Sequence, residues 1–376
     1  MAEPSVTIQK GSLVLVTGIT GFVGTHTAKQ FLERGYKVRG TVRNIDTASW
    51  VVNGVLKAYA VRGDLELVEV PEMGADKAFD EAVKGVSAIA HVATNDLVPD
   101  PNIAIHNTVR GVTGLLEAAL REPSVREFVF TGSIVAAVNL LDNKAVHVVR
   151  DTWNDAVIQL AWAPPPYDVA RVPVVYFATK VISEKVIWAF AEQRHPQFNI
   201  NVVSPASIIG LPLGSKHANT PPGYPTWMVR ELFSGKTSGP DIVSGSESID
   251  PPIPSELLES ILVRRWSYGL WLRTLAVLSV DVQDIALLHV AAVLDPDTKS
   301  ARIQAWGIPS TWNDYLAAFR RIWPQRKFID DVTSSAYLHV TTDSSQALEL
   351  LKKWGHGQDG WRPFEQSVKD TFVEVN

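Results

Sequence analysis

The sequence predicts an α/β fold: a doubly wound parallel sheet, followed by a smaller, mixed region towards the C-terminus. Short β-rich apolar runs alternate with helical patterns through the first half of the chain. This alternation stops after Pro205, where Pro, Gly and Trp become frequent. With 376 residues, 46% of them hydrophobic and 20% charged, the chain can bury a large core.

Six apolar runs are the expected strands of the sheet. They cover residues 13–17, 37–41, 65–70, 88–92, 127–131 and 199–204. Helical patterns separate most of these runs, which favours parallel strands joined by right-handed crossovers. Because a ligand of such a sheet binds outside the carboxyl ends of the strands, we expect the side chains that carry chemistry at that edge.

The second half of the chain contains two further helical patterns, at 281–293 and 312–322, so the tail is folded. We expect residues 1–205, with about 281–300, to form the sheet domain. Residues 206–280 and 301–376 are expected to form the smaller region.

A glycine-rich turn follows the first predicted strand and opens the helical pattern at 25–34. The turn reads Gly18, Ile19, Thr20, Gly21, Phe22, Val23, Gly24. Glycines at these places let the backbone approach a pyrophosphate, whose charge is favoured at a helix N-terminus. The pattern predicts a dinucleotide site in a Rossmann domain, and the alternative is a glycine turn with no ligand.

Two arginines indicate which dinucleotide is bound. An NAD site would place an acidic residue about 20 residues after the first glycine, to bind the ribose hydroxyl. Here the second strand carries Arg39 and is followed by Arg43, and guanidinium groups bind phosphate through two hydrogen bonds. NADP(H) is therefore the predicted cofactor. The alternative is that both are surface arginines and Asp46 contacts the ribose.

Tyr176 and Lys180 are the predicted catalytic pair, on a helix running from Tyr176 to about residue 193. Residues four apart share a helix face, so the phenol and the ammonium point the same way. A phenol can protonate a carbonyl oxygen while hydride reaches the carbon, and we expect Lys180 to lower the pKa of the phenol. Ser133, just beyond the fifth strand, would bind the same oxygen; alternatively it caps a helix.

With these motifs the sequence resembles the extended short-chain dehydrogenase/reductases, and within them the fungal aldehyde or carbonyl reductases related to plant dihydroflavonol reductases. The resemblance covers residues 11–372. It also rests on Gly40 with Thr41, on His91 with Val92 and Ala93, on residues 203–210, and on Gly360, Trp361 and Arg362. It implies NADPH-dependent reduction of aldehydes, ketones or keto esters to alcohols.

The resemblance also implies roles for individual residues. Ser133, Tyr176 and Lys180 match the catalytic trio. The implied cofactor-binding residues are Gly18, Thr20, Gly21, Phe22, Val23, Gly24, Arg39, Arg43, Glu72, Met73, Ala93, Thr94, Thr131, Tyr176, Lys180, Pro205 and Ser207. Residues 236–272 have no counterpart in such relatives.

The substrate pocket is predicted in the smaller region, where apolar side chains gather. Pro221, Pro222, Trp227 and Met228 are the candidates for an apolar wall facing a small carbonyl substrate. The alternative is that they only pack a core. The sequence leaves the physiological substrate and the handedness of the alcohol product open.

Composition excludes several other classes. The net charge of -5 provides no basic surface for nucleic acid. Cysteine is absent, which excludes disulfides and thiolate chemistry, and no histidine pattern suggests a metal site. Without a signal segment or a membrane-spanning stretch, we expect a cytoplasmic monomer or homodimer.

Two rival functions share parts of this pattern. A nucleotide-sugar epimerase or dehydratase can have the same fold and trio, but Ser204 and Pro205 stand where such relatives usually have Arg-Pro. A non-catalytic NADP-sensing regulator would often lack the Tyr and Lys pair that is present here.

Overall fold

A seven-stranded parallel sheet forms the centre of the molecule. The computed structural model describes residues 4–94, 98–140, 144–214, 224–235, 277–332 and 337–373. The strand order is β10-β7-β5-β4-β1-β2-β3. The strands are β1 (Leu13–Thr17), β2 (Lys37–Val42), β3 (Leu65–Glu69), β4 (Ala88–His91), β5 (Glu127–Thr131), β7 (Asn199–Pro205) and β10 (Arg302–Ala305). The doubly wound class is confirmed, and the six predicted strands are present with ends within one residue of the expected ones.

The seventh strand, β10, was not predicted. It pairs in parallel with β7. We grouped residues 301–376 with the smaller region, but β10 lies in the large sheet. This strand is hard to predict from sequence, because Arg302 and Gln304 are polar although each is only 7% exposed. A run of four residues that alternates polar and apolar is typical of a strand with one exposed face, so it does not predict a strand buried on both faces.

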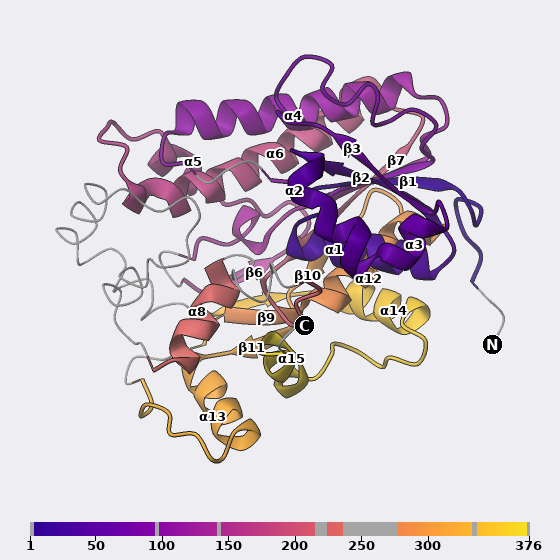
Figure 1. Ribbon diagram of the computed structural model, residues 1–376. Helices are drawn as coiled ribbons and strands as arrows, with labels where there is room; N and C mark the ends of the chain where they lie inside the picture. The colour runs from indigo at the N-terminus through magenta and orange to yellow at the C-terminus, as the bar shows by residue number, and fades with distance from the viewer. Residues whose placement is uncertain are drawn as a thin grey trace.

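Helices cover both faces of the sheet, and the alternation of side chains along β1 shows how. Val14 and Val16 pack in one core with α1 (Phe22–Glu33) and α12 (Val282–Leu294). Leu15 packs in the other core, with α4 (Pro101–Arg121) and α6 (Val172–Arg194). Successive residues of a strand point to opposite faces, so a continuous apolar run contributes side chains to the cores on both faces of the sheet. Figure 1 shows α4 and α6 together on one side of the sheet and α1 and α12 on the other.

Shorter helices complete the layers. They are α2 (Ile45–Trp50), α3 (Lys57–Val61), α5 (Ala156–Ala161) and α14 (Ser345–Trp354), with single turns at Val51–Val55, Ile134–Ala136 and Val169–Arg171. No helix in the described part of the chain is long and apolar enough to span a bilayer.

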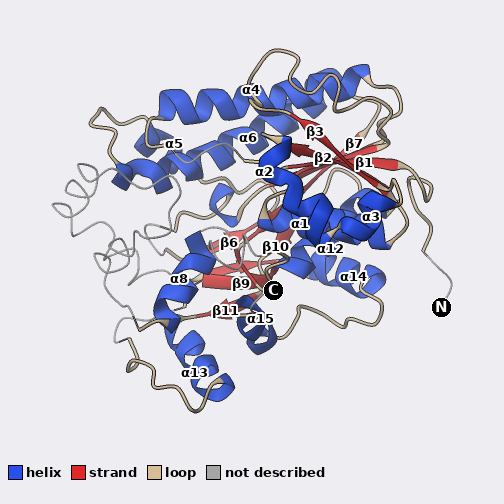
Figure 2. Ribbon diagram, viewed as in Figure 1, coloured by secondary structure: helices blue, strands red, loops and turns tan. Residues whose placement is uncertain are grey.

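The smaller region has its own sheet and core (Figure 2). Its sheet has the order β11-β9-β8, formed by Ile308–Ser310, Val277–Asp281 and Ser207–Ile209. Helices α8 (Tyr224–Phe233), α13 (Trp312–Ile322) and α15 (Phe364–Thr371) pack around a separate apolar cluster that includes Met228, Tyr315 and Phe319. A two-stranded sheet joins β6 (Val146–Val148) to β12 (Val340–Thr342). The unmatched stretch 236–272 lies outside the described residues.

Candidate active site

The glycine turn between β1 and α1 is built for a close approach of its backbone to a ligand. Gly18 has φ +66°, a conformation that favours glycine. A Cβ on Gly24 would lie 2.2 Å from the carbonyl oxygen of Gly18, so only glycine fits there. Gly21 is the N-cap of α1 and offers no side chain to the first amides of the helix, and the first turn holds no acid. The turn thus fits the pyrophosphate of a dinucleotide.

Neighbouring strands hold this turn in place. The Gly18 amide donates to the hydroxyl of Thr41 at the end of β2, at 3.1 Å. The Thr17 hydroxyl oxygen accepts from the amides of Val92 and Ala93, both at 3.0 Å. The Thr17 hydroxyl therefore donates its own hydrogen bond to Nδ1 of His91, 2.8 Å away. Burial lowers the pKa of His91 to about 3, so the ring is a neutral acceptor.

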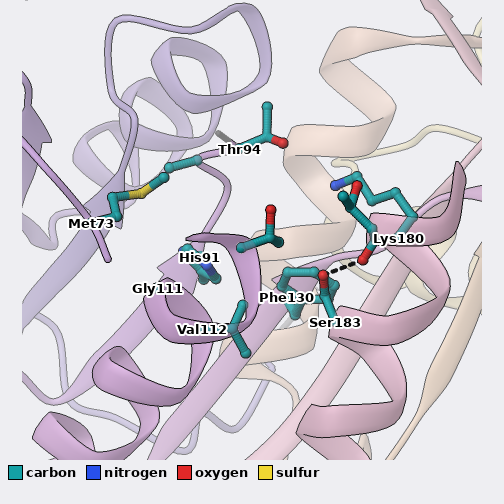
Figure 3. A pocket seen from close by; sticks show the side chains of 11 residues that line it. Met73, His91, Thr94, Gly111, Val112, Phe130, Lys180 and Ser183 are labelled. Atoms are coloured by element: carbon teal, nitrogen blue, oxygen red, sulfur yellow. Dashed lines mark hydrogen bonds between the residues drawn. The ribbon is translucent and has the colours of Figure 1, made fainter. Parts of the chain in front are cut away.

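A pocket opens beside this edge of the sheet and contains four of the predicted site residues: Met73, Ala93, Thr94 and Lys180. Figure 3 shows Met73 and Lys180 on opposite sides of it. Its other lining residues are His91, Thr108, Gly111, Val112, Phe130, Thr179 and Ser183. Sequence reasoning assigned none of these seven to the site. Thr108 and Gly111 of α4 are the ones a pattern could have revealed, as small residues one helical turn apart.

Helix α6 carries the predicted pair but begins before it. The helix starts at Val172 with Pro173 in its first turn, so Tyr176 lies one turn inside rather than at the start. Lys180 is 7% exposed, and its Nζ lies 5.9 Å from the centre of the Tyr176 ring. Both side chains therefore occupy one face of α6, as the spacing predicts.

Ser133 joins this face from the end of β5. Its hydroxyl interacts with the Tyr176 phenol in a way that favours the phenolate. The same oxygen also accepts from the Val135 amide, at 3.4 Å, at the start of the short turn Ile134–Ala136. The contact with the phenol and the helix-capping contact are both present, so the alternatives set out for Ser133 are compatible.

The pKa of Tyr176 differs from the expectation. Burial raises it to about 12, and the interaction with Ser133 opposes that shift. The net lowering of the phenol's pKa that we expected beside Lys180 is therefore not found, because burial outweighs it; the Lys180 ammonium donates to the carbonyl oxygen of Thr131, at 2.9 Å. At neutral pH the phenol stays protonated.

Thr131 is held on two sides. Its carbonyl accepts from Lys180, and its hydroxyl lies 2.7 Å from Nε2 of His289 on α12. His289 Nδ1 donates to the carbonyl of Ile285, so Nε2 is the acceptor for the hydroxyl. Burial lowers the pKa of His289 to about 4, which keeps this ring neutral. The strand end that carries Ser133 is thus held by the neutral His289 ring and by the Lys180 ammonium.

The two arginines predicted to bind the extra phosphate have different surroundings. Arg39 pairs with Glu66 at 2.6 Å and donates to the carbonyl oxygens of Ala82 and Lys84, which precede β4. Its guanidinium thus points to the amino end of the sheet, away from the glycine turn. These contacts favour the alternative interpretation of Arg39, in which it does not bind the cofactor phosphate. Arg43 is exposed directly after β2, at the carboxyl edge.

The remaining predicted cofactor residues lie at the same carboxyl edge. Pro205 ends β7 and Ser207 begins β8. Thr20 and Val23 are partly exposed in the glycine turn, whereas Phe22 is buried against the ring of His26. Glu72, after β3, is exposed and does not line the pocket.

The predicted substrate wall has a different outcome. Met228 is 4% exposed and packs in the core of the smaller region, which favours the packing alternative for it. Pro221 and Pro222 lie outside the described residues, as does the side chain of Trp227. Within the described ranges, no group of three or more His, Asp or Glu side chains could hold a metal ion.

Comparison with known proteins agrees with this architecture. Residues 14–246 match the NAD dependent epimerase/dehydratase family. The chain is 33% identical to NAD-dependent epimerase/dehydratase terH of Aspergillus terreus, over 98% of each chain. It is 31% identical to aldehyde reductase 2 of Sporidiobolus salmonicolor, over 96% of each. The structure of Gre2 from Candida albicans in complex with NADPH superimposes with a TM-score of 0.74 at 21% identity, covering 96% of this chain and 98% of that one.

Proposed function

Because the chain belongs to the NAD dependent epimerase/dehydratase family, we propose that it reduces aldehydes, ketones or keto esters to alcohols with NADPH. One observation carries the proposal. A protonated phenol, a serine hydroxyl and a lysine ammonium converge from α6 and the end of β5, beside a glycine turn suited to a pyrophosphate. This is the set of groups that carbonyl reduction requires.

In the proposed reaction NADPH, when bound, supplies the hydride. Tyr176, which is protonated at neutral pH, donates its proton to the substrate oxygen. Ser133 donates a hydrogen bond to the same oxygen and orients it. Lys180 provides the positive charge that stabilises the phenolate left on Tyr176.

The holding residues for NADPH are proposed from their places in the fold. Gly18, Gly21 and Gly24 would hold the pyrophosphate, and Arg43 the additional phosphate. Met73, Ala93 and Thr94 line the pocket that also contains Lys180. The relative named aldehyde reductase 2 and the NADPH complex of Gre2 support this choice of reaction and cofactor.

A redox-neutral epimerase or dehydratase is the second candidate, because the relative with 33% identity has that name. The two functions differ in cofactor consumption. A reductase oxidises one NADPH for each carbonyl reduced, whereas an epimerase returns its cofactor unchanged. A panel of aldehydes, aryl ketones and keto esters, followed by NADPH absorbance, separates them. Sustained oxidation supports reduction, and no oxidation with any member overturns it.

Tyr176→Phe tests the assignment of the acid. We expect kcat to fall by roughly 10²–10⁴-fold, the usual contribution of a positioned acid, with NADPH affinity retained. The matched control is Tyr315→Phe, since Tyr315 is also buried with a raised pKa but lies in the smaller region. Near-normal turnover in Tyr176→Phe would refute the role of this phenol.

A further inference from the structure

Glu184 extends the catalytic face of α6 by one more turn. Tyr176, Lys180 and Glu184 are spaced four apart, so they share one side of the helix. The Glu184 carboxylate accepts from Nε of Arg302 at 2.6 Å. The side chains of this pair are 0% and 1% exposed, respectively. Arg302 belongs to β10, so the edge strand of the large sheet reaches the catalytic helix through this ion pair.

Stability alone is a poor explanation for such a pair. Removing two charges from water costs several kcal/mol per ion, and apolar replacements of buried pairs are often neutral or stabilising. The second oxygen of Glu184, Oε2, is buried and has no hydrogen-bond partner among the described residues. A carboxylate kept at this cost is expected to act on something nearby.

The end of β5 leaves space for this carboxylate. A Cβ on Gly132 would lie 3.2 Å from Glu184 Oε2 and 2.9 Å from a methyl carbon of Val202. Gly132 lies between Thr131, whose carbonyl accepts from Lys180, and Ser133, which lowers the pKa of the Tyr176 phenol. Glu184 thus packs beneath the turn that joins all three members of the trio.

The charged and titratable groups around Lys180 come from four elements. Tyr176 and Glu184 lie on α6, His91 on β4, His289 on α12, and Arg302 on β10 as the partner of Glu184. Both histidines are neutral near pH 7, because burial lowers their pKa to about 3 and about 4. Burial raises the pKa of Glu184, and the charge of Arg302 opposes that rise. Among the described residues, Glu184 is the carboxylate whose charge offsets the burial of the ammonium.

We propose that Glu184, anchored by Arg302, is a positioning residue that keeps the buried Lys180 charged beside the Tyr176 phenol. The proposal rests on the proposed function, in which the Lys180 charge stabilises the phenolate of Tyr176.

The direction of its effect follows from the two opposing influences on Lys180. Burial lowers the pKa of Lys180 to about 8, and the charge of Glu184 raises it. Activity that requires the ammonium declines as the pH rises through this pKa. Without the Glu184 charge the pKa falls further, so the alkaline decline begins at lower pH.

Glu184→Gln tests the proposal through the pH profile of kcat/KM between pH 5.5 and 9.5. We expect the alkaline decline to move down by about one pH unit or more, as for the loss of an opposite charge close to an ionisable group. Glu184→Asp retains the charge and should keep the alkaline decline closer to that of the wild type. An unchanged profile in Glu184→Gln would overturn the proposal.

A second readout does not require turnover. NADPH affinity can be measured by fluorescence over the same pH range. As the pH rises, this affinity should begin to weaken at a lower pH in Glu184→Gln than in the wild type. If the wild type consumes no NADPH with any carbonyl compound, the proposed function fails, and this titration still tests Glu184. If the wild type turns over and neither readout moves, only the role of Glu184 fails.

Folding must be controlled, because Glu184→Gln leaves the Arg302 charge buried. The double variant Glu184→Gln/Arg302→Met removes both charges and should show the same shift with better stability. Asp295→Asn is the matched control: it removes the partner of Lys353, 2.7 Å away, and of the Trp354 indole, and these contacts include no member of the trio. An equal shift in Asp295→Asn would reduce the effect to general destabilisation and overturn the proposal.

Discussion

The sheet domain and the smaller region position their side chains by different means. In the sheet domain, many candidate site residues lie at the ends of strands, and the pairing register of the strands sets where each end lies. Thr17 on β1 and Thr131 on β5 are examples. In the smaller region, side chains such as Met228 and Phe319 are placed by packing in one apolar cluster. The first arrangement follows from local sequence and strand order. The second depends on which surfaces meet, so a sequence pattern says little about which of its side chains face a substrate.

The largest effect is expected at the glycine turn. Gly24→Ala places a Cβ 2.2 Å from the Gly18 carbonyl oxygen, which belongs to backbone that cannot easily move. We expect NADPH affinity to fall by more than about 100-fold, since a shift of the turn disrupts several amide contacts at once. Fluorescence titration measures the loss.

Gly114→Ala is the control for that prediction. Gly114 lies inside α4, and a Cβ there would meet nothing within 4 Å. The change should preserve NADPH affinity and stabilise the helix by about 0.5–1 kcal/mol. Wild-type affinity in Gly24→Ala would show that the backbone of the turn does not approach the cofactor.

The next largest difference in cofactor affinity is expected between substitutions of Arg43 and Arg39. Arg43→Ala should weaken NADPH binding by roughly 10–100-fold and leave NADH binding nearly unchanged, because hydrogen bonds to charged groups contribute about 1.5–3 kcal/mol. Arg39→Ala should leave both affinities within about twofold, since its guanidinium contacts Glu66 and two carbonyls at the other end of the sheet. Binding measurements with both dinucleotides check the pair. A selective loss in Arg39→Ala instead would reverse the assignment.

The smallest effect on the cofactor is expected in the smaller region. Met228→Ala should lower the free energy of unfolding by about 2–4 kcal/mol, because it leaves a cavity in a packed core. NADPH affinity should not change. Denaturant unfolding and substrate KM are the measurements. A stable variant with altered KM would place Met228 in the substrate wall and remove this contrast between the two regions.

Several features of the site could be predicted from sequence, and others could not. The glycine turn and the Tyr176–Lys180 pair are local patterns, so their spacing alone fixes the geometry. Val112 of α4 lines the pocket only because this helix packs over the sheet there. The sign of the Tyr176 pKa shift depends on burial, and burial is a property of everything packed around the phenol.

The sequence by itself determined the parallel sheet, the turn suited to a dinucleotide and the shared face of α6, because each follows from the periodicity of one strand or helix. Only the tertiary structure decided that Arg39 is occupied at the far end of the sheet and that Arg302 pairs with Glu184 beneath the catalytic residues. Both pairings join residues distant in sequence. Strand order and burial bring such residues together, and neither is encoded in a short stretch of chain.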